Sequence, residues 1–307
     1  MKVRELTKYL EQLAPLALQE PYDNSGLLVG DPEMEIKQAL IALDCTEAVL
    51  DEAIRLGCNL VITHHPIVFK GLKRLTGSNY VERTVIKAIQ NNIALYAIHT
   101  NLDNVTGGVN SKIAEKLGLE QQQILSPKGQ LLRKLVVFVP LDHAEKVRNA
   151  LFDAGAGKVG DYDQCSFNAQ GEGTFRAGDG TKPFVGEVGQ RHQEQETRVE
   201  VIYPAYLQHN IITAMSQAHP YEEVAYDIYT LENTFQQVGG GMIGVLPEPM
   251  NPIGFLQFLK ESIGAQVIRH TALPGHKIKK VAVCGGSGGL LLADAVRAEA
   301  DVFVTAD

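Results

Sequence analysis

The chain has 307 residues, of which 45% are hydrophobic and 21% charged; these are the proportions of a folded globular protein with room for two domains. Its formal net charge of -8 argues against general nucleic-acid binding, and no apolar run approaches the length of a membrane span. The four cysteines form no C-x-x-C pair, and the N-terminal residues do not resemble a signal peptide, so we expect a reduced, cytoplasmic protein.

Strand-like and helix-like patterns alternate through the first part of the chain. Apolar side chains recur at helical spacing over residues 3–13. Short buried strands are indicated at 39–43, 60–63 and 93–98, each followed by a helical pattern. The polar, turn-rich segment 21–26 is most simply a connector. This alternation predicts an α/β fold with a mostly parallel sheet flanked by helices.

The pattern changes after Pro127. The following segment shows the order strand, helix, strand, strand, helix, strand, which is the ferredoxin-like arrangement. The glycines at 239–241 have the composition of a hinge on its far side. We therefore predict a first part of the α/β domain at 1–127, an inserted ferredoxin-like α+β domain at 128–234, and a second part of the α/β domain at 235–307.

The α/β pattern resumes in the last segment. A glycine-rich run at 285–289 follows a buried strand, but it fits neither a Walker loop nor a dinucleotide-binding fingerprint and is best explained as a tight turn before a helix. The final strand ends at Asp307 without the covering element that a buried strand needs. We therefore expect the natural chain to continue into a C-terminal tail.

Polar residues follow the ends of the predicted buried strands. Pro66, which has no N–H group to donate, ends the strand that carries two adjacent histidines. Because the carboxyl ends of parallel strands meet at one edge of a sheet, this pattern predicts a ligand site there. The strand-end residues are Asp44, the pair His64 and His65, the pair His99 and Asp103, and Asp307.

Two adjacent histidines at a strand end favour a pair of metal ions. Neighbouring strand residues point to opposite faces, and two ions roughly 3.5–4 Å apart can each take one imidazole. Asp103 is the best-placed carboxylate and could bridge the ions, with His99 orienting a ligand. Asp44 is either a similar orienting group or, like Asp307, a helix cap or loop residue. The alternative for His64 and His65 is one buried, hydrogen-bonded imidazole and one exposed imidazole.

Three basic residues, Lys70, Lys73 and Arg74, follow the histidine pair closely. Side chains of this type would suit an anionic substrate such as a phosphorylated molecule. A solvated basic loop explains them equally well.

Several motifs together resemble one known family, the GTP cyclohydrolase 1 type 2 homologues, also called Nif-three-like proteins. The likeness extends over the whole chain, and the two histidine motifs carry most of its specificity. The matching segments are Thr63–Pro66 with Phe69–Leu72, His99–Asp103, Pro21–Leu27, Asp301–Asp307 and, in the insert, His219–Glu223.

This resemblance implies a Nif-three-like α/β fold with a PII/CutA-like inserted domain. It also implies a dinuclear site in which His64, His65 and Asp103 bind two divalent ions of zinc, manganese or iron. The family's remaining ligands, a His and a Glu, would lie beyond Asp307. Members of this kind are expected to form a ring-shaped homohexamer with the inserts near the openings of the ring.

Two functions are consistent with these features. The first is a metal-dependent hydrolase that resembles GTP cyclohydrolase 1 type 2 and acts on a nucleotide-like or other small anionic substrate through metal-activated water. The second is a non-catalytic, metal-binding regulatory or scaffold protein whose insert senses a ligand. No residue outside the expected ligand set has the pattern of a general acid or base, so the sequence leaves both functions open.

Overall fold

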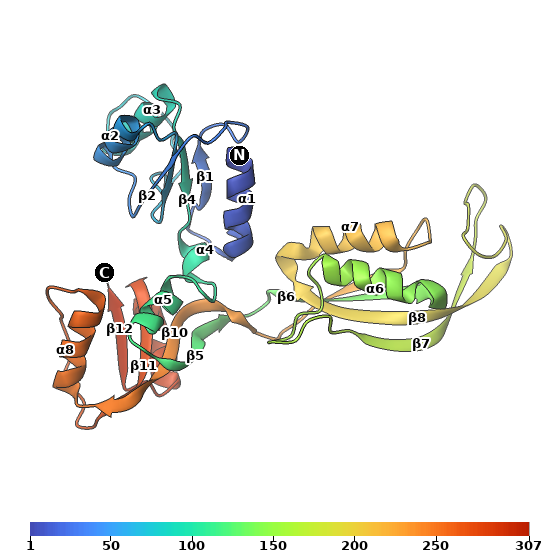
Figure 1. The fold of residues 1–307 in the computed structure, drawn as a ribbon. Helices are drawn as coiled ribbons and strands as arrows, with labels where there is room; N and C mark the ends of the chain where they lie inside the picture. The colour runs from blue at the N-terminus through green and yellow to red at the C-terminus, as the bar shows by residue number, and fades with distance from the viewer. Residues whose placement is uncertain (307) are drawn as a thin grey trace. The chain divides into compact units, whose positions relative to one another are not determined.

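The computed structural model describes residues 1–306, which divide into two compact units (Figure 1). Unit 1 comprises Met1–Ser126 and the segment from Gln237 onward, and unit 2 comprises Pro127–Gln236. No helix among residues 1–306 combines the length and hydrophobicity needed to cross a membrane. The sequence predicts an independently folding insert at 128–234, and unfolding experiments test this prediction.

The first sheet of unit 1 has the strand order β1-β4-β3-β2. The pairs β2–β3 and β3–β4 are parallel, and β1 lies antiparallel on β4. All four residues of β3 are buried, as expected for a strand that is covered on both faces. The strands are β1 (Gly26–Val29), β2 (Ala39–Ala42), β3 (Leu60–Thr63) and β4 (Ala94–Ala97).

Helices cover both faces of this sheet. On one face α1 (Val3–Leu13) packs through Val3 against the alternate residues Leu60 and Ile62 of β3. On the other face α2 (Glu47–Leu56) and α3 (Tyr80–Gln90) pack against Val61. Both of these helices begin at a side-chain cap, Thr46 for α2 and Asn79 for α3, which fixes where they start relative to the strands.

The rest of unit 1 contains a second sheet, which corrects the prediction of one mostly parallel sheet. Its strand order is β12-β11-β10-β5, and β11 pairs parallel with β12 but antiparallel with β10. Strand periodicity predicts that a segment is a strand but does not identify its partner, and here the returning strand pairs with β5. These strands are β5 (Glu120–Lys128), β10 (Phe235–Met250), β11 (Ile278–Ser287) and β12 (Val302–Ala306).

The last strand, β12, belongs to this second sheet and pairs parallel with β11. The strand-end residues that were predicted to share one sheet edge therefore belong to two sheets. Asp307 itself lies outside the described residues. The remaining α-helices of unit 1 are α4 (Thr100–Asp103), α5 (Val109–Lys116), α8 (Pro252–Ile263) and α9 (Leu292–Arg297).

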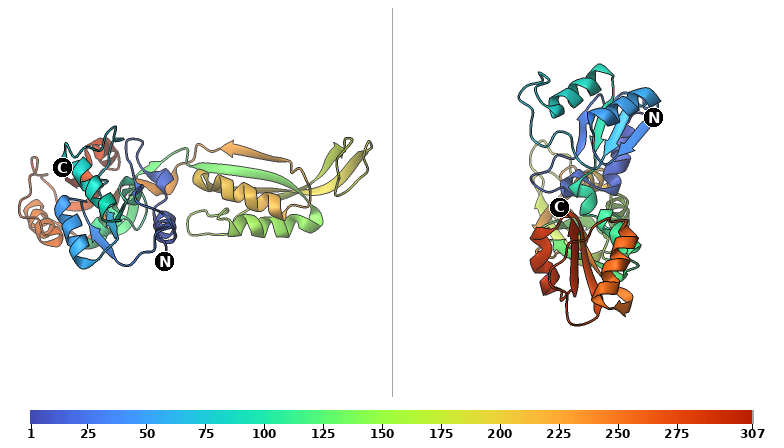
Figure 2. Two further views of the ribbon diagram at one scale, coloured as in Figure 1. Left: turned by 90° about the horizontal axis from the view of Figure 1, so that it is seen from above. Right: turned by 90° about the vertical axis from the view of Figure 1, so that its left-hand side faces the viewer.

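Unit 2 is an antiparallel sheet with two helices on one face, seen side by side in Figure 2. The sheet order is β7-β8-β6-β9, and the chain order is strand, helix, strand, strand, helix, strand, as in the ferredoxin-like arrangement. Leu151 and Ile211, one from each helix, are fully buried against Leu135 and Val137 of β6. The elements are β6 (Leu132–Pro140), α6 (Ala144–Asp153), β7 (Phe167–Arg176), β8 (Arg191–Pro204), α7 (Gln208–Ala218) and β9 (Tyr226–Thr230).

Candidate metal centre

Three imidazole rings converge at the carboxyl edge of the first sheet. His64 and His65 follow β3, and His99 follows the neighbouring parallel strand β4. The ring centroid of His64 lies 5.0 Å from that of His65 and 5.1 Å from that of His99. One nitrogen atom from each ring lies within 4.8 Å of the other two. The two adjacent histidines therefore do converge, and the third ring joins them because parallel strands end side by side.

Each ring is oriented by a hydrogen bond from its Nδ1 atom to an oxygen atom. A carbonyl or carboxylate oxygen only accepts, so each Nδ1 carries the proton and each Nε2 keeps a free lone pair. This is the arrangement in which protein histidines bind metals. The acceptors are the Ile98 carbonyl for His64 at 2.9 Å, the Asp44 carboxylate for His65 at 2.7 Å, and the Asp23 carboxylate for His99 at 2.7 Å.

Asp103 lies at the end of α4, one helical turn after His99, and faces His64. Its Oδ1 atom is 3.8 Å from Nε2 of His64. That oxygen is buried and makes no hydrogen bond within residues 1–306, which is costly for a carboxylate unless a cation partners it. Burial is the main reason that the pKa of Asp103 is raised to about 6. A divalent cation beside this oxygen would remove that cost, so the residues present fit a metal.

The donor set also agrees with a metal. Imidazole nitrogen with carboxylate oxygen suits zinc, manganese or iron. Burial lowers the pKa of His64, which keeps the ring in the neutral form that can bind a cation. His65 is more open, with 46% of its side chain exposed, and gives the cluster a side from which a ligand can approach.

Asp23 is a functional candidate that the sequence reasoning missed. The turn-rich composition of 21–26 favours a connector, yet the Asp23 side chain is completely buried (0% exposed) and accepts hydrogen bonds from His99 and from the backbone and hydroxyl of Thr100. Burial alone would raise the pKa of Asp23, but the hydrogen bonds from His99 and Thr100 outweigh it and the pKa is lowered. The only signal for Asp23 in the sequence was the likeness of Pro21–Leu27 to a family segment.

The three basic residues lie on the exposed loop between β3 and α3. Among residues 1–306, Lys70, Lys73 and Arg74 form no ion pair or hydrogen bond with the imidazole cluster, so their role toward an anion stays a prediction. The same loop does contribute an aromatic wall. The Phe69 ring lies 6.1 Å from that of His99 and stacks at 6.4 Å on Tyr22.

The second sheet reaches the cluster through the end of β11. Asn110 links the two parts: its amide nitrogen donates to the Asp103 carbonyl at 3.0 Å, and its side-chain oxygen accepts from the Gly285 N–H at 2.7 Å. Burial, and then the negative charge of Asp103, raise the pKa of Cys284 to about 11. The Cys284 thiol therefore stays protonated near the carboxylate.

The fold and this cluster define a mixed α/β protein with histidines able to bind a metal. The chain belongs to the Duf34/NIF3 (NGG1p interacting factor 3) family, whose model matches residues 1–307, and this confirms the family inferred from the motifs. It is 40% identical to the GTP cyclohydrolase 1 type 2 homolog of Bacillus subtilis over 99% of this chain and 82% of the relative.

Two further comparisons support the same family. The Mycobacterium tuberculosis protein of the same name is 36% identical over 100% of this chain and 82% of its own length. The crystal structure of a Bacillus cereus protein related to NIF3 matches with a TM-score of 0.88 and 42% identity, and covers 100% of this chain and 82% of that one. The α/β architecture is therefore that of NIF3-related structures.

Proposed function

We propose that this protein is a metal-dependent hydrolase with a dinuclear centre held by His64, His65 and Asp103. The observation that supports this proposal most directly is the buried, unpartnered Asp103 Oδ1 atom, which lies beside imidazoles whose Nε2 lone pairs are free. The position of His99 admits it as a further nitrogen donor, beyond the orienting role expected from the sequence. Four donor atoms can satisfy one ion, and a second ion would rely on a bridging carboxylate and on water.

The proposed substrate is nucleotide-like or otherwise small and anionic, in keeping with the name that the relatives carry, GTP cyclohydrolase 1 type 2 homolog. Divalent ions in such a centre would activate water and polarise the bond that it attacks. The residues of this chain would hold the centre: Asp44 and Asp23 keep the rings in the binding tautomer. The exposed basic loop after β3 would attract the anion.

A second candidate function is a non-catalytic, metal-binding regulator with a ligand-sensing insert. It is favoured by the cavity in unit 2 described below and by the strand and helix order of that unit, which is consistent with a PII/CutA-like module. For either function we propose a ring-shaped homohexamer in the cytoplasm. Analytical ultracentrifugation tests whether six chains associate.

Metal analysis followed by a turnover screen separates these possibilities. Zinc and manganese titrations by calorimetry should give two ions per chain for the parent protein, and fewer for His65→Ala or Asp103→Asn. His270→Ala, which changes an exposed histidine remote in sequence from the cluster, is the matched control. Unchanged metal content in both cluster variants would overturn the site. Metal binding without turnover of GTP or other nucleotides would favour the regulator.

A further inference from the structure

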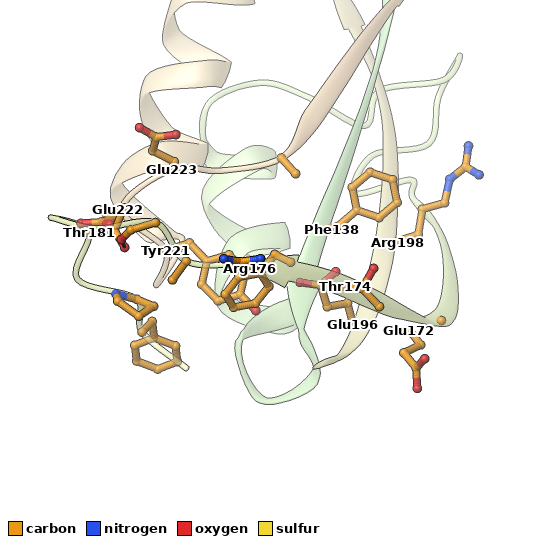
Figure 3. A pocket seen from close by; sticks show the side chains of 18 of the residues that line it. Phe138, Glu172, Thr174, Arg176, Thr181, Glu196, Arg198, Tyr221, Glu222 and Glu223 are labelled. Carbon is orange, nitrogen blue, oxygen red and sulfur yellow. Dashed lines mark hydrogen bonds between the residues drawn. The ribbon is translucent and has the colours of Figure 1, made fainter. Parts of the chain in front are cut away.

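Unit 2 contains a cavity of about 760 Å³ that plays no part in the metal centre. It is formed by β7, β8, the loop between them and the segment after α7, and Figure 3 shows Tyr221, Arg176 and Glu196 among the side chains that line it. A volume of this size is typical of small-molecule sites.

Aromatic rings make up much of the cavity wall. The centroid of Tyr221 lies 6.1 Å from that of Phe175 on β7 and 6.3 Å from that of Phe184 on the β7–β8 loop. The buried His219 holds this wall in place: its Nε2 donates to the Phe138 carbonyl at 2.9 Å, and its Nδ1 accepts from the Tyr221 N–H at 3.1 Å. The wall is thus fixed before any ligand arrives, which lowers the entropic cost of binding.

The loop that carries Phe184 is itself tied down. The backbone N–H of Lys182 donates to the Glu222 carboxylate at 2.9 Å, and the N–H of Gly189 donates to the Ala177 carbonyl at 2.9 Å. Phe184 also lies 5.3 Å from the ring of His143. These contacts hold one aromatic ring of the cavity against the others.

A carboxylate without a cationic partner lies within this aromatic wall. Glu196 of β8 forms no ion pair within residues 1–306, and burial raises its pKa. Its carboxylate fills the space above Gly173, where an added Cβ would come within 2.2 Å of Oε2. The hydroxyl of Tyr221 is buried beside the Glu196 carboxylate. Because no cation pairs with Glu196 in the described part of the chain, its carboxylate is available to a positively charged ligand.

The other charged side chains that line the cavity also favour a positively charged ligand. Four carboxylates line the cavity against two guanidinium groups, those of Arg176 and Arg198. Arg198 is already paired with Glu200 at 2.9 Å. The cavity is therefore a partly buried, net negative site with aromatic walls.

We propose that this cavity binds a small organic cation, an amidinium, guanidinium or protonated amine on an apolar body, with Glu196 as its counter-ion. Aromatic faces attract cations, and a carboxylate accepts charge-assisted hydrogen bonds from N–H groups. The proposal concerns unit 2 alone and holds whether or not the metal centre of unit 1 turns over a substrate.

Calorimetric titration of the full chain with benzamidine, in the presence of a chelator, tests the assignment. We expect saturable binding of one molecule per chain, at least tenfold weaker for Glu196→Gln, and unchanged for Glu232→Gln, an exposed carboxylate of the same unit. The neutral analogue benzamide should bind at least tenfold more weakly than benzamidine, and benzoate should not bind.

Phe184→Ala provides a second variant in case Glu196→Gln fails to fold, because Phe184 is about half exposed and its removal leaves the core intact. It should weaken benzamidine binding by about 3- to 30-fold, the range for loss of a cation–π contact. Equal binding of benzamide and benzamidine, unchanged affinity in both cavity variants, or no saturable heat at millimolar benzamidine would overturn the proposal.

Discussion

Replacing Asp23 with asparagine should weaken metal binding although Asp23 is not itself a proposed ligand. The two carboxylate oxygens divide their work: Oδ1 accepts from His99 Nδ1 and the Asn24 N–H, and Oδ2 accepts from the Thr100 N–H, its hydroxyl and the Ser25 hydroxyl. An asparagine keeps one acceptor oxygen and replaces the other with an NH₂ donor. One of the two sets of hydrogen-bond donors must then face the NH₂ group, which is itself a donor, and that set loses its acceptor.

The two possible orientations of the amide have different costs. With its oxygen toward His99, the amide leaves the Thr100 N–H without an acceptor, at a cost of about 1–3 kcal/mol in folding free energy. With its NH₂ toward His99, the amide forces the imidazole to carry its proton on Nε2, the atom that faces the cluster. The Asn24 N–H is then also left without an acceptor. The second orientation blocks coordination by His99 altogether.

Loss of such an orienting partner typically lowers metal affinity 10–100-fold. We therefore expect Asp23→Asn to raise the dissociation constant for zinc or manganese by that factor in a calorimetric titration. Asp31→Asn, an exposed aspartate that accepts from the Glu33 N–H, is the control and should behave as the parent. A lower melting temperature with unchanged metal affinity would show that Asp23 is only structural and refute the reasoning.

Two further outcomes concern stability. The buried Glu82 carboxylate accepts from the backbone and hydroxyls of Thr76 and Ser78, which lowers its pKa to about 2 from an ordinary 4.5. The contribution of the ionised Glu82 carboxylate to folding stability is therefore complete above pH 4.5 and is lost as the pH falls toward 2. The difference in melting temperature between the parent and Glu82→Gln should narrow over that range. A difference that does not depend on pH would contradict the assignment. Leu151→Ala, in the core of unit 2, should cost about 2–5 kcal/mol and lower a unit 2 transition in calorimetry while the unit 1 transition stays in place; one shared transition that shifts as a whole would show a single cooperative domain.

Sequence patterns were most informative where burial is continuous. Strand β3 is buried on both faces, so its apolar run stands out, and the polar residues directly after it mark the sheet edge. Parallel pairing with β4 then brings His64, His65 and His99 together without any further information. This part of the candidate site follows from local chemistry and one topological rule.

The rest depends on contacts that periodicity does not encode. Strand β5 begins Glu120-Gln121-Gln122-Gln123, a polar run with no strand-like alternation, and it forms because β10 pairs with it. The sheet therefore divides in two where a single sheet was expected. Asp23 reaches His99 across 76 positions of sequence, so only the folded chain shows that a turn residue orients an imidazole.

The pairing of β5 with β10 has a bearing on how the chain accommodates unit 2. These two strands lead into unit 2 and back out of it, and they are neighbours in one sheet. Unit 2 thus takes the position of the loop in a β-hairpin, and a turn of two to five residues is the usual connection between such strands. The entropy of closing a loop grows only slowly with its length, so a pre-folded module at this position adds little cost to bringing β5 and β10 together. The same strand pair could accept a short turn, unit 2 or a different folded module, which makes this junction a natural point for exchanging parts between proteins.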